Sequence, residues 1–124
     1  MSREVIHQII GMMEDIRAKK PLVHHITNYV TVNDCANIVL AIGASPIMAD
    51  DIDEVETITS ISSALVINIG TLNRRTIESM VAAGKKANEL GIPVVLDPVG
   101  AGASALRNET TERLLAEVKV TVLR

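Results

Sequence analysis

The chain has 124 residues, about one small domain, and its content of 48% apolar and 22% charged residues excludes an intrinsically disordered protein. The net charge of −3 excludes the basic surface that a DNA-binding protein needs. Tyr29 is the only aromatic residue, so the stacking platform of a single-strand nucleic-acid binder is also excluded. The apolar residues are mainly Ile, Val, Ala and Leu, which suits buried parallel strands.

Segments with helical spacing of apolar residues alternate with short aliphatic runs along the chain. The first segment is an amphipathic helix over residues 3–19, with Ser2 as its expected N-cap. The aliphatic runs, which we expect to be strands, cover residues 22–26, 45–49, 64–69, 94–97 and 119–123. The remaining helices are predicted over residues 33–42, 52–61, from the N-cap Asn73 to Leu90, and over 109–117, with a glycine-rich loop from Pro98 to Ser104. This alternation predicts an α/β fold with a mainly parallel sheet and right-handed crossovers.

The chain ends at Arg124, directly after the last predicted strand, whereas every earlier strand passes into a loop and a helix. We therefore interpret the chain as the first part of a longer α/β protein, and a complete small doubly wound domain is the alternative. The single cysteine excludes an intramolecular disulfide and a thiolate metal cluster. No run of about 18 uncharged apolar residues and no signal peptide is found, so we expect a cytoplasmic protein.

Candidate binding residues lie where the predicted strands end, because ligands of open α/β sheets bind outside the carboxyl ends of the strands. Asp97 follows three apolar strand residues and precedes a proline. A carboxylate there could hold Mg²⁺, directly or through water, and an Asp that caps the following loop is an equal alternative. Met48, at another strand end, is either a core residue or part of a pocket wall for an apolar ring.

Three other patterns favour structural roles. His24 and His25 are adjacent in a strand, so they face opposite sides of the sheet and cannot bind one metal together. The acidic run from Asp50 to Glu56 is typical of a solvated helix start, with a cation site as the alternative. The glycine-rich residues 100–104 match neither nucleotide fingerprint, so a flexible connection is favoured over an anion-binding loop.

Four segments at these spacings resemble the hydroxyethylthiazole kinase family. They are residues 21–28 (PLVHHITN), 43–49 (GASPIMA), 65–72 (LVINIGTL) and 95–103 (VLDPVGAGA), and the resemblance runs from about residue 5 to Arg124. It implies a ribokinase-like fold, a three-layer α/β/α sandwich, of which this chain is the N-terminal portion of a single kinase domain. It also implies transfer of the γ-phosphoryl group of ATP to the primary hydroxyl of 4-methyl-5-(2-hydroxyethyl)thiazole in thiamine salvage. The reaction would need Mg²⁺, and the protein would be a homotrimer with its thiazole sites between subunits.

The resemblance also implies roles for single residues. Met48 would contact the thiazole, and Asn28, Gly70 and Thr71 would line the same pocket. Asp97 would belong to the Mg²⁺ and phosphate environment, and Arg124 would contact an ATP phosphate.

Family members are about twice as long as this chain, and their second half carries the anion hole, the group that activates the hydroxyl and most of the ATP pocket. We therefore expect these parts beyond Arg124, and we expect residues 1–124 alone to be inactive. Two alternatives are kept: a binding or assembly module that uses the same pocket without phosphoryl transfer, and a related kinase for another small alcohol, such as a pyrimidine.

Overall fold

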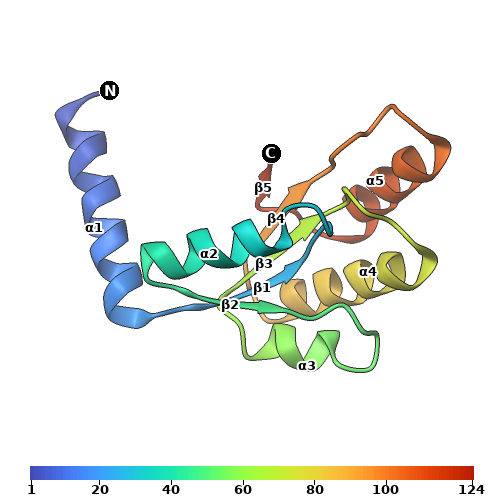
Figure 1. Ribbon diagram of the computed structural model, residues 1–124, viewed down its shortest axis with the longest axis horizontal. Coiled ribbons are helices and arrows are strands. Elements are labelled where there is room, and N and C mark those ends of the chain that lie inside the picture. Colours follow the sequence, from blue (N-terminus) through green and yellow to red (C-terminus); the bar gives the residue numbers. More distant parts are fainter.

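A computed structural model describes residues 1–124 as a single parallel β-sheet with helices on both of its faces (Figure 1). The strands are β1 (Leu22–Ile26), β2 (Ser45–Met48), β3 (Ala64–Asn68), β4 (Val94–Asp97) and β5 (Val122–Leu123). Their order across the sheet is β2-β1-β3-β4-β5, and every neighbouring pair is parallel. The predicted α/β fold with a parallel sheet is thus confirmed.

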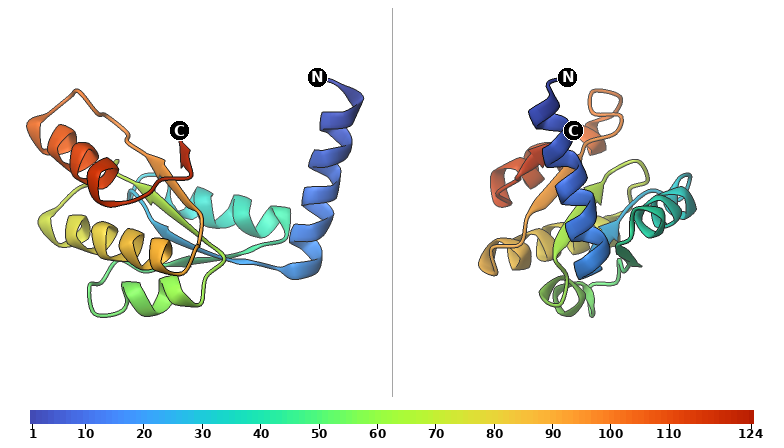
Figure 2. Two further views of the ribbon diagram at one scale, coloured as in Figure 1. Left: turned by 180° about the vertical axis from the view of Figure 1, so that it is seen from behind. Right: turned by 90° about the vertical axis from the view of Figure 1, so that its left-hand side faces the viewer.

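The strand order decides which helix covers which face. The helices are α1 (Arg3–Lys19), α2 (Val32–Ile42), α3 (Val55–Ser60), α4 (Arg74–Glu89) and α5 (Ala105–Glu117). From β1 the chain steps outward to β2, and from there it returns across the sheet to β3, β4 and β5. Because crossovers are right-handed, the two directions place α2 on one face and α3, α4 and α5 on the other (Figure 2).

The hydrophobic core lies between the sheet and the helices α3, α4 and α5. Alternate residues of the strands, among them Leu65, Ile67 and Leu96, point to this face and are almost completely buried. Helix α4 packs closely because Gly84 faces Val118, where a Cβ atom on the glycine would come within 2.6 Å of a valine methyl group. The aliphatic side chains therefore form one tightly packed layer between the sheet and these helices.

The opposite face of the sheet is less completely covered. Helix α2 lies over it, but Val66 and Val95 on β3 and β4 are only half-buried. Helix α1 stands away from the sheet and buries none of its residues (Figure 1). Ser2 caps this helix as predicted, because its hydroxyl accepts a hydrogen bond from the backbone N–H of Val5.

Three predicted boundaries differ from the structure by more than one residue. Helix α5 begins at Ala105 and not at residue 109, because the Ser104 hydroxyl caps its first turn. Helix α3 begins at Val55, and residues 52–54 form a turn. The last strand contains only Val122 and Leu123, at the edge of the sheet. None of the helices is both long enough and apolar enough to cross a membrane.

Candidate active site at the carboxyl ends of the strands

The loops after β1 and β3 meet at the point where the chain reverses its direction across the sheet. In an open α/β sheet, ligands usually bind at the carboxyl ends of the two strands beside such a reversal. We call this place, where Asn28, Asn68, Gly70 and Thr71 meet, the crevice. The Asn28 amide, after β1, donates a hydrogen bond of 3.0 Å to the Asn68 side-chain oxygen at the end of β3. The backbone N–H of Tyr29 donates to the Thr71 hydroxyl at 3.2 Å. These contacts hold the two loops together.

A row of polar side chains continues from this crevice along the edge of the sheet. The Asn68 amide donates to Asp97 Oδ2 at 2.9 Å, and Arg124 donates to the same oxygen at 2.8 Å. The row therefore runs Asn28, Asn68, Asp97, Arg124, with one member at or just after the carboxyl end of each of the strands β1, β3, β4 and β5. The Asp97 side chain is 16% exposed and that of Arg124 is 77% exposed, so the arginine is the solvent-accessible end of the pair.

Gly70 is required by the close packing of the crevice. Its backbone N–H donates to the Asn68 side-chain oxygen at 2.9 Å. A Cβ atom at this position would come within 2.9 Å of both the Asn28 Cβ and the Asn68 side-chain oxygen. Any side chain here would push apart the two asparagines that join β1 to β3.

Arg107, on α5, is a structural support of the site that the sequence did not indicate. Its guanidinium donates to the backbone oxygens of Ile69 at 2.7 Å, Gly70 at 2.9 Å and Val99 at 2.6 Å. It thereby joins the loops after β3 and β4. The sequence held no signal for this role, because one arginine in a polar helix resembles any other exposed cation.

Met48 lines a hollow of about 160 Å³, and Asn28, Gly70 and Thr71 are not among the residues that line it. The hollow is lined by His25, Thr27, Tyr29, Val32, Met48, Ala49 and Asp50. The loop from Thr27 to Thr31 belongs to both places, since Asn28 lies in the crevice and Tyr29 lines the hollow and bonds to Thr71. The four residues that the resemblance grouped in one pocket therefore lie in two adjoining parts of the same edge.

His24 fixes the end of β2 next to this hollow. Its side chain is fully buried, with Nε2 2.7 Å from the Ala49 carbonyl oxygen and Nδ1 3.0 Å from the Thr59 hydroxyl. Burial lowers the pKa of His24, and the bond to Ala49 and the charge of Glu54 oppose this shift. The neutral ring therefore donates to Ala49 and accepts from Thr59, which ties β1, β2 and α3 together.

The acidic run at residues 50–56 is a solvated, ion-paired turn that leads into the first residues of α3. Arg75 of α4 lies 3.4 Å from Asp50 and 3.5 Å from Asp51, and an Asp51 oxygen accepts a hydrogen bond from the Asp53 backbone. No group of three or more histidine, cysteine or acidic side chains in the chain could hold a metal ion. In the polar row, the Asp97 carboxylate pairs with one cation, Arg124.

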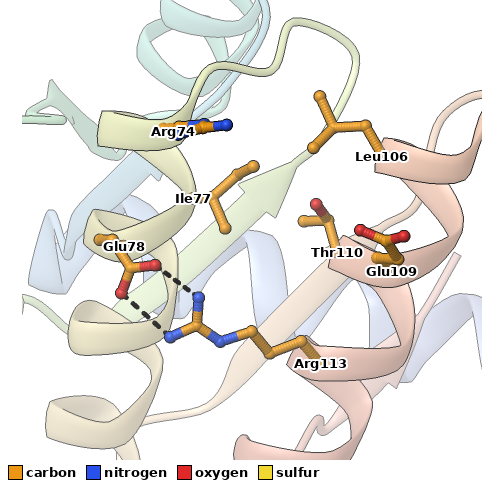
Figure 3. A pocket seen from close by; sticks show the side chains of 7 residues that line it. All are labelled: Arg74, Ile77, Glu78, Leu106, Glu109, Thr110 and Arg113. Atoms are coloured by element: carbon orange, nitrogen blue, oxygen red, sulfur yellow. Dashed lines mark hydrogen bonds and ion pairs between the residues drawn. The ribbon is translucent and has the colours of Figure 1, made fainter.

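A larger hollow lies elsewhere, between α4 and α5, with a volume of about 410 Å³ (Figure 3). Arg113 extends across it and forms a bidentate ion pair with Glu78. This pair lowers the pKa of Glu78 and raises that of Arg113. Glu78 and Arg113 thus satisfy each other across this hollow, whereas the polar row lies at the edge where ligands of such sheets bind.

Comparison with known proteins identifies the family. The family model described as the hydroxyethylthiazole kinase family matches residues 13–124. The chain belongs to this family. A curated hydroxyethylthiazole kinase from Clostridium beijerinckii is 74% identical over 124 residues, which is 100% of this chain and 45% of that protein. Another, from Ruminiclostridium cellulolyticum, is 73% identical over 98% of this chain and 44% of its own length.

The solved structure of a hydroxyethylthiazole kinase from Pyrococcus horikoshii OT3 has the same fold. It superposes with a TM-score of 0.90 at 48% identity, over 94% of this chain and 46% of that one. The ribokinase-like architecture implied by the resemblance is therefore confirmed for the described residues. The chain spans about half the length of the hydroxyethylthiazole kinases it matches.

Proposed function

We propose that the intact protein transfers the γ-phosphoryl group of ATP to the primary hydroxyl of 4-methyl-5-(2-hydroxyethyl)thiazole, as a cytoplasmic enzyme of thiamine salvage. The observation that carries this proposal is the 74% identity to a hydroxyethylthiazole kinase over all residues of the chain. The matched region includes every strand end of the candidate site, because it covers 100% of this chain. Residues 1–124 form the N-terminal portion of the kinase domain in this proposal.

The alcohol occupies the crevice between β1 and β3 together with the hollow beside β2. Met48 contacts the thiazole ring, since an unbranched thioether adapts to a flat apolar surface. Asn28, Gly70 and Thr71 line the adjoining part of the site. The rigid contacts among Asn28, Asn68 and Gly70 support this assignment, because they preserve the shape of the crevice before a ligand enters.

ATP phosphates approach the other end of the polar row. Arg124 is exposed and presents a planar cation suited to a phosphate. Asp97 fits a Mg²⁺ ion held largely by water and phosphate oxygens, because Mg²⁺ often takes only one or two carboxylates from a protein. The ion would neutralise charge on the phosphates, while Asp97 and Asn68 position it and Arg124 exchanges its contact with Asp97 for one with phosphate.

The rest of the catalytic machinery lies beyond Arg124 in this proposal. It comprises the anion hole and the group that activates the hydroxyl. The protein acts as a homotrimer with its thiazole sites between subunits. The half-buried sheet face over β3 and β4 and the exposed apolar side chains of α1 support further packing partners for these residues.

The decisive experiment is an assay of the intact protein with ATP and Mg²⁺ against a panel of small alcohols. ADP release and phosphorus NMR of the product should show a phosphate ester of the thiazole alcohol. Phosphorylation of a pyrimidine alcohol in preference to the thiazole would instead identify a related kinase. Tight binding of the thiazole alcohol without turnover would identify a binding module.

A further inference from the structure

The hollow beside β2 contains polar groups that this chain does not satisfy. His25 is only 6% exposed, yet neither of its ring nitrogens has a hydrogen-bond partner. The buried hydroxyl of Thr27, which lines the same hollow, also has none. An unpaired buried polar group destabilises the folded state, so such groups in a native protein usually have a partner of another kind.

The two adjacent histidines differ in whether their ring nitrogens are hydrogen-bonded. His24, on the opposite face of the same strand, has both ring nitrogens bonded within the chain. His25 lies directly beside Met48 in the register of β1 and β2, so the two side chains share one face of the sheet. The unpaired imidazole is therefore next to the residue to which we assign the thiazole ring.

The electrostatics of the hollow define what kind of group His25 can bind. Burial lowers the pKa of His25, and the adjacent His24 lowers it further. The ring is therefore neutral at pH 7 and offers one N–H donor and one acceptor nitrogen. Together with the apolar surfaces of Val32 and Met48, this suits a small heteroaromatic ring with an acceptor atom in its plane.

We propose that His25 and Thr27 determine specificity for the ring of the alcohol, with the His25 imidazole N–H donating a hydrogen bond to the ring nitrogen of the thiazole. This inference rests on the proposed function. Thr27 supports the pairing through its hydroxyl, which lies in the same hollow. A site built in this way discriminates against rings without the acceptor, because its polar groups would then stay unpaired.

The test compares the thiazole alcohol with a thiophene analogue in which a C–H group replaces the ring nitrogen. Binding to the intact protein is measured by titration calorimetry without nucleotide. The wild type should bind the thiazole about tenfold more tightly than the analogue. His25→Leu should bind both compounds equally, at about the affinity of the wild type for the analogue. Thr27→Val should weaken thiazole binding and Thr27→Ser should restore it, while His7→Leu, on the exposed helix α1, should change neither affinity.

A second measurement needs no variant. Long-range proton–nitrogen NMR spectra of the intact protein with isotope-labelled histidine should show the His25 ring nitrogens shifting on saturation with the thiazole alcohol, while those of His24 stay in place. Full discrimination by a folded His25→Leu protein, or unmoved His25 resonances in the saturated complex, would overturn the inference and leave the proposed function standing. A wild-type protein that neither binds nor phosphorylates the thiazole alcohol would overturn both.

Discussion

Asp97 lies in the middle of the polar row, where Asn68 and Arg124 both donate to one of its oxygens. Asp97→Asn retains the size of the side chain and removes the charge that would organise Mg²⁺. We expect turnover by the intact enzyme to fall by about tenfold or more, corresponding to roughly 1.4 kcal/mol of transition-state stabilisation. Steady-state kinetics at limiting Mg²⁺ measure this, and thiazole binding without nucleotide should change little.

The control for this substitution is Glu78→Gln, which breaks the ion pair with Arg113 in the hollow between α4 and α5. It removes the same charge from an ion pair on a different surface, so turnover should stay near the wild-type value. Normal turnover of Asp97→Asn would mean that this carboxylate only caps the loop after β4.

Met48 and Arg124 occupy opposite ends of the candidate site, so their substitutions should separate the two substrates. Met48→Ala removes an apolar contact and should weaken thiazole binding by about 1–3 kcal/mol. Arg124→Ala removes an exposed cation and should mainly raise the KM for ATP. Measuring both Michaelis constants for both variants tests this, and an effect of either variant on the other substrate alone would contradict our placement of the ligands.

At the scale of elements, two glycines inside helices have opposite surroundings. A Cβ atom on Gly84 of α4 would collide with Val118, whereas one on Gly11 of α1 would meet no atom within 4 Å. Gly84→Ala should therefore destabilise the fold by about 1–3 kcal/mol through overpacking. Gly11→Ala should stabilise α1 by up to about 1 kcal/mol, because alanine is the better helix former. Urea denaturation of both variants measures this difference, and equal stabilities would show that α4 can move away from Val118.

At the scale of the whole molecule, the buried histidines make stability depend on pH. Burial lowers the pKa of both His24 and His25 in the folded state relative to their usual 6.5. Below about pH 6.5 the unfolded chain therefore binds more protons than the folded one, and the free energy of unfolding falls as the pH falls. Above this range the two histidines are neutral in both states, so their contribution is constant.

Denaturant titrations of the intact protein between about pH 7.5 and pH 5.5 measure this dependence. His7→Gln, on the exposed helix α1, should leave the slope unchanged. A free energy of unfolding that stays constant over this range would show that protonated His24 and His25 are accommodated in the folded state.

The exposed apolar surfaces of the chain also bear on its oligomeric state. We expect the intact protein to sediment as an oligomer, with a trimer implied by the resemblance. Apolar side chains such as Ile6 and Ile9 on α1 are exposed, and the face of the sheet over β3 and β4 is half-buried. Sedimentation velocity and light scattering measure the state, and a clean monomer would contradict the assignment of thiazole sites between subunits.

The sequence by itself determined the order of the elements, because that order follows from local patterns. Aliphatic runs predicted all five strands, and caps such as Ser2 and Asn73 predicted helix starts, since an N-cap acts within its own turn. The strand ends also indicated where polar residues would gather, and four specific segments resembled the family that the comparisons confirmed. The start of α5 was missed because its apolar spacing is weak, and Ser104 alone marked it.

Only the tertiary structure decided which polar groups are paired and which are not. The contact of Asp97 with Arg124, the support from Arg107 and the pairing of Met48 with His25 all depend on the strand order, which brings distant segments to one edge. The two adjacent histidines differ for the same reason: His24 faces the layer that holds Thr59, and His25 faces the side of the sheet with the hollow next to Met48. A sequence pattern shows that neighbouring strand residues face opposite sides, but the partner on each side is chosen by packing between residues far apart in the chain.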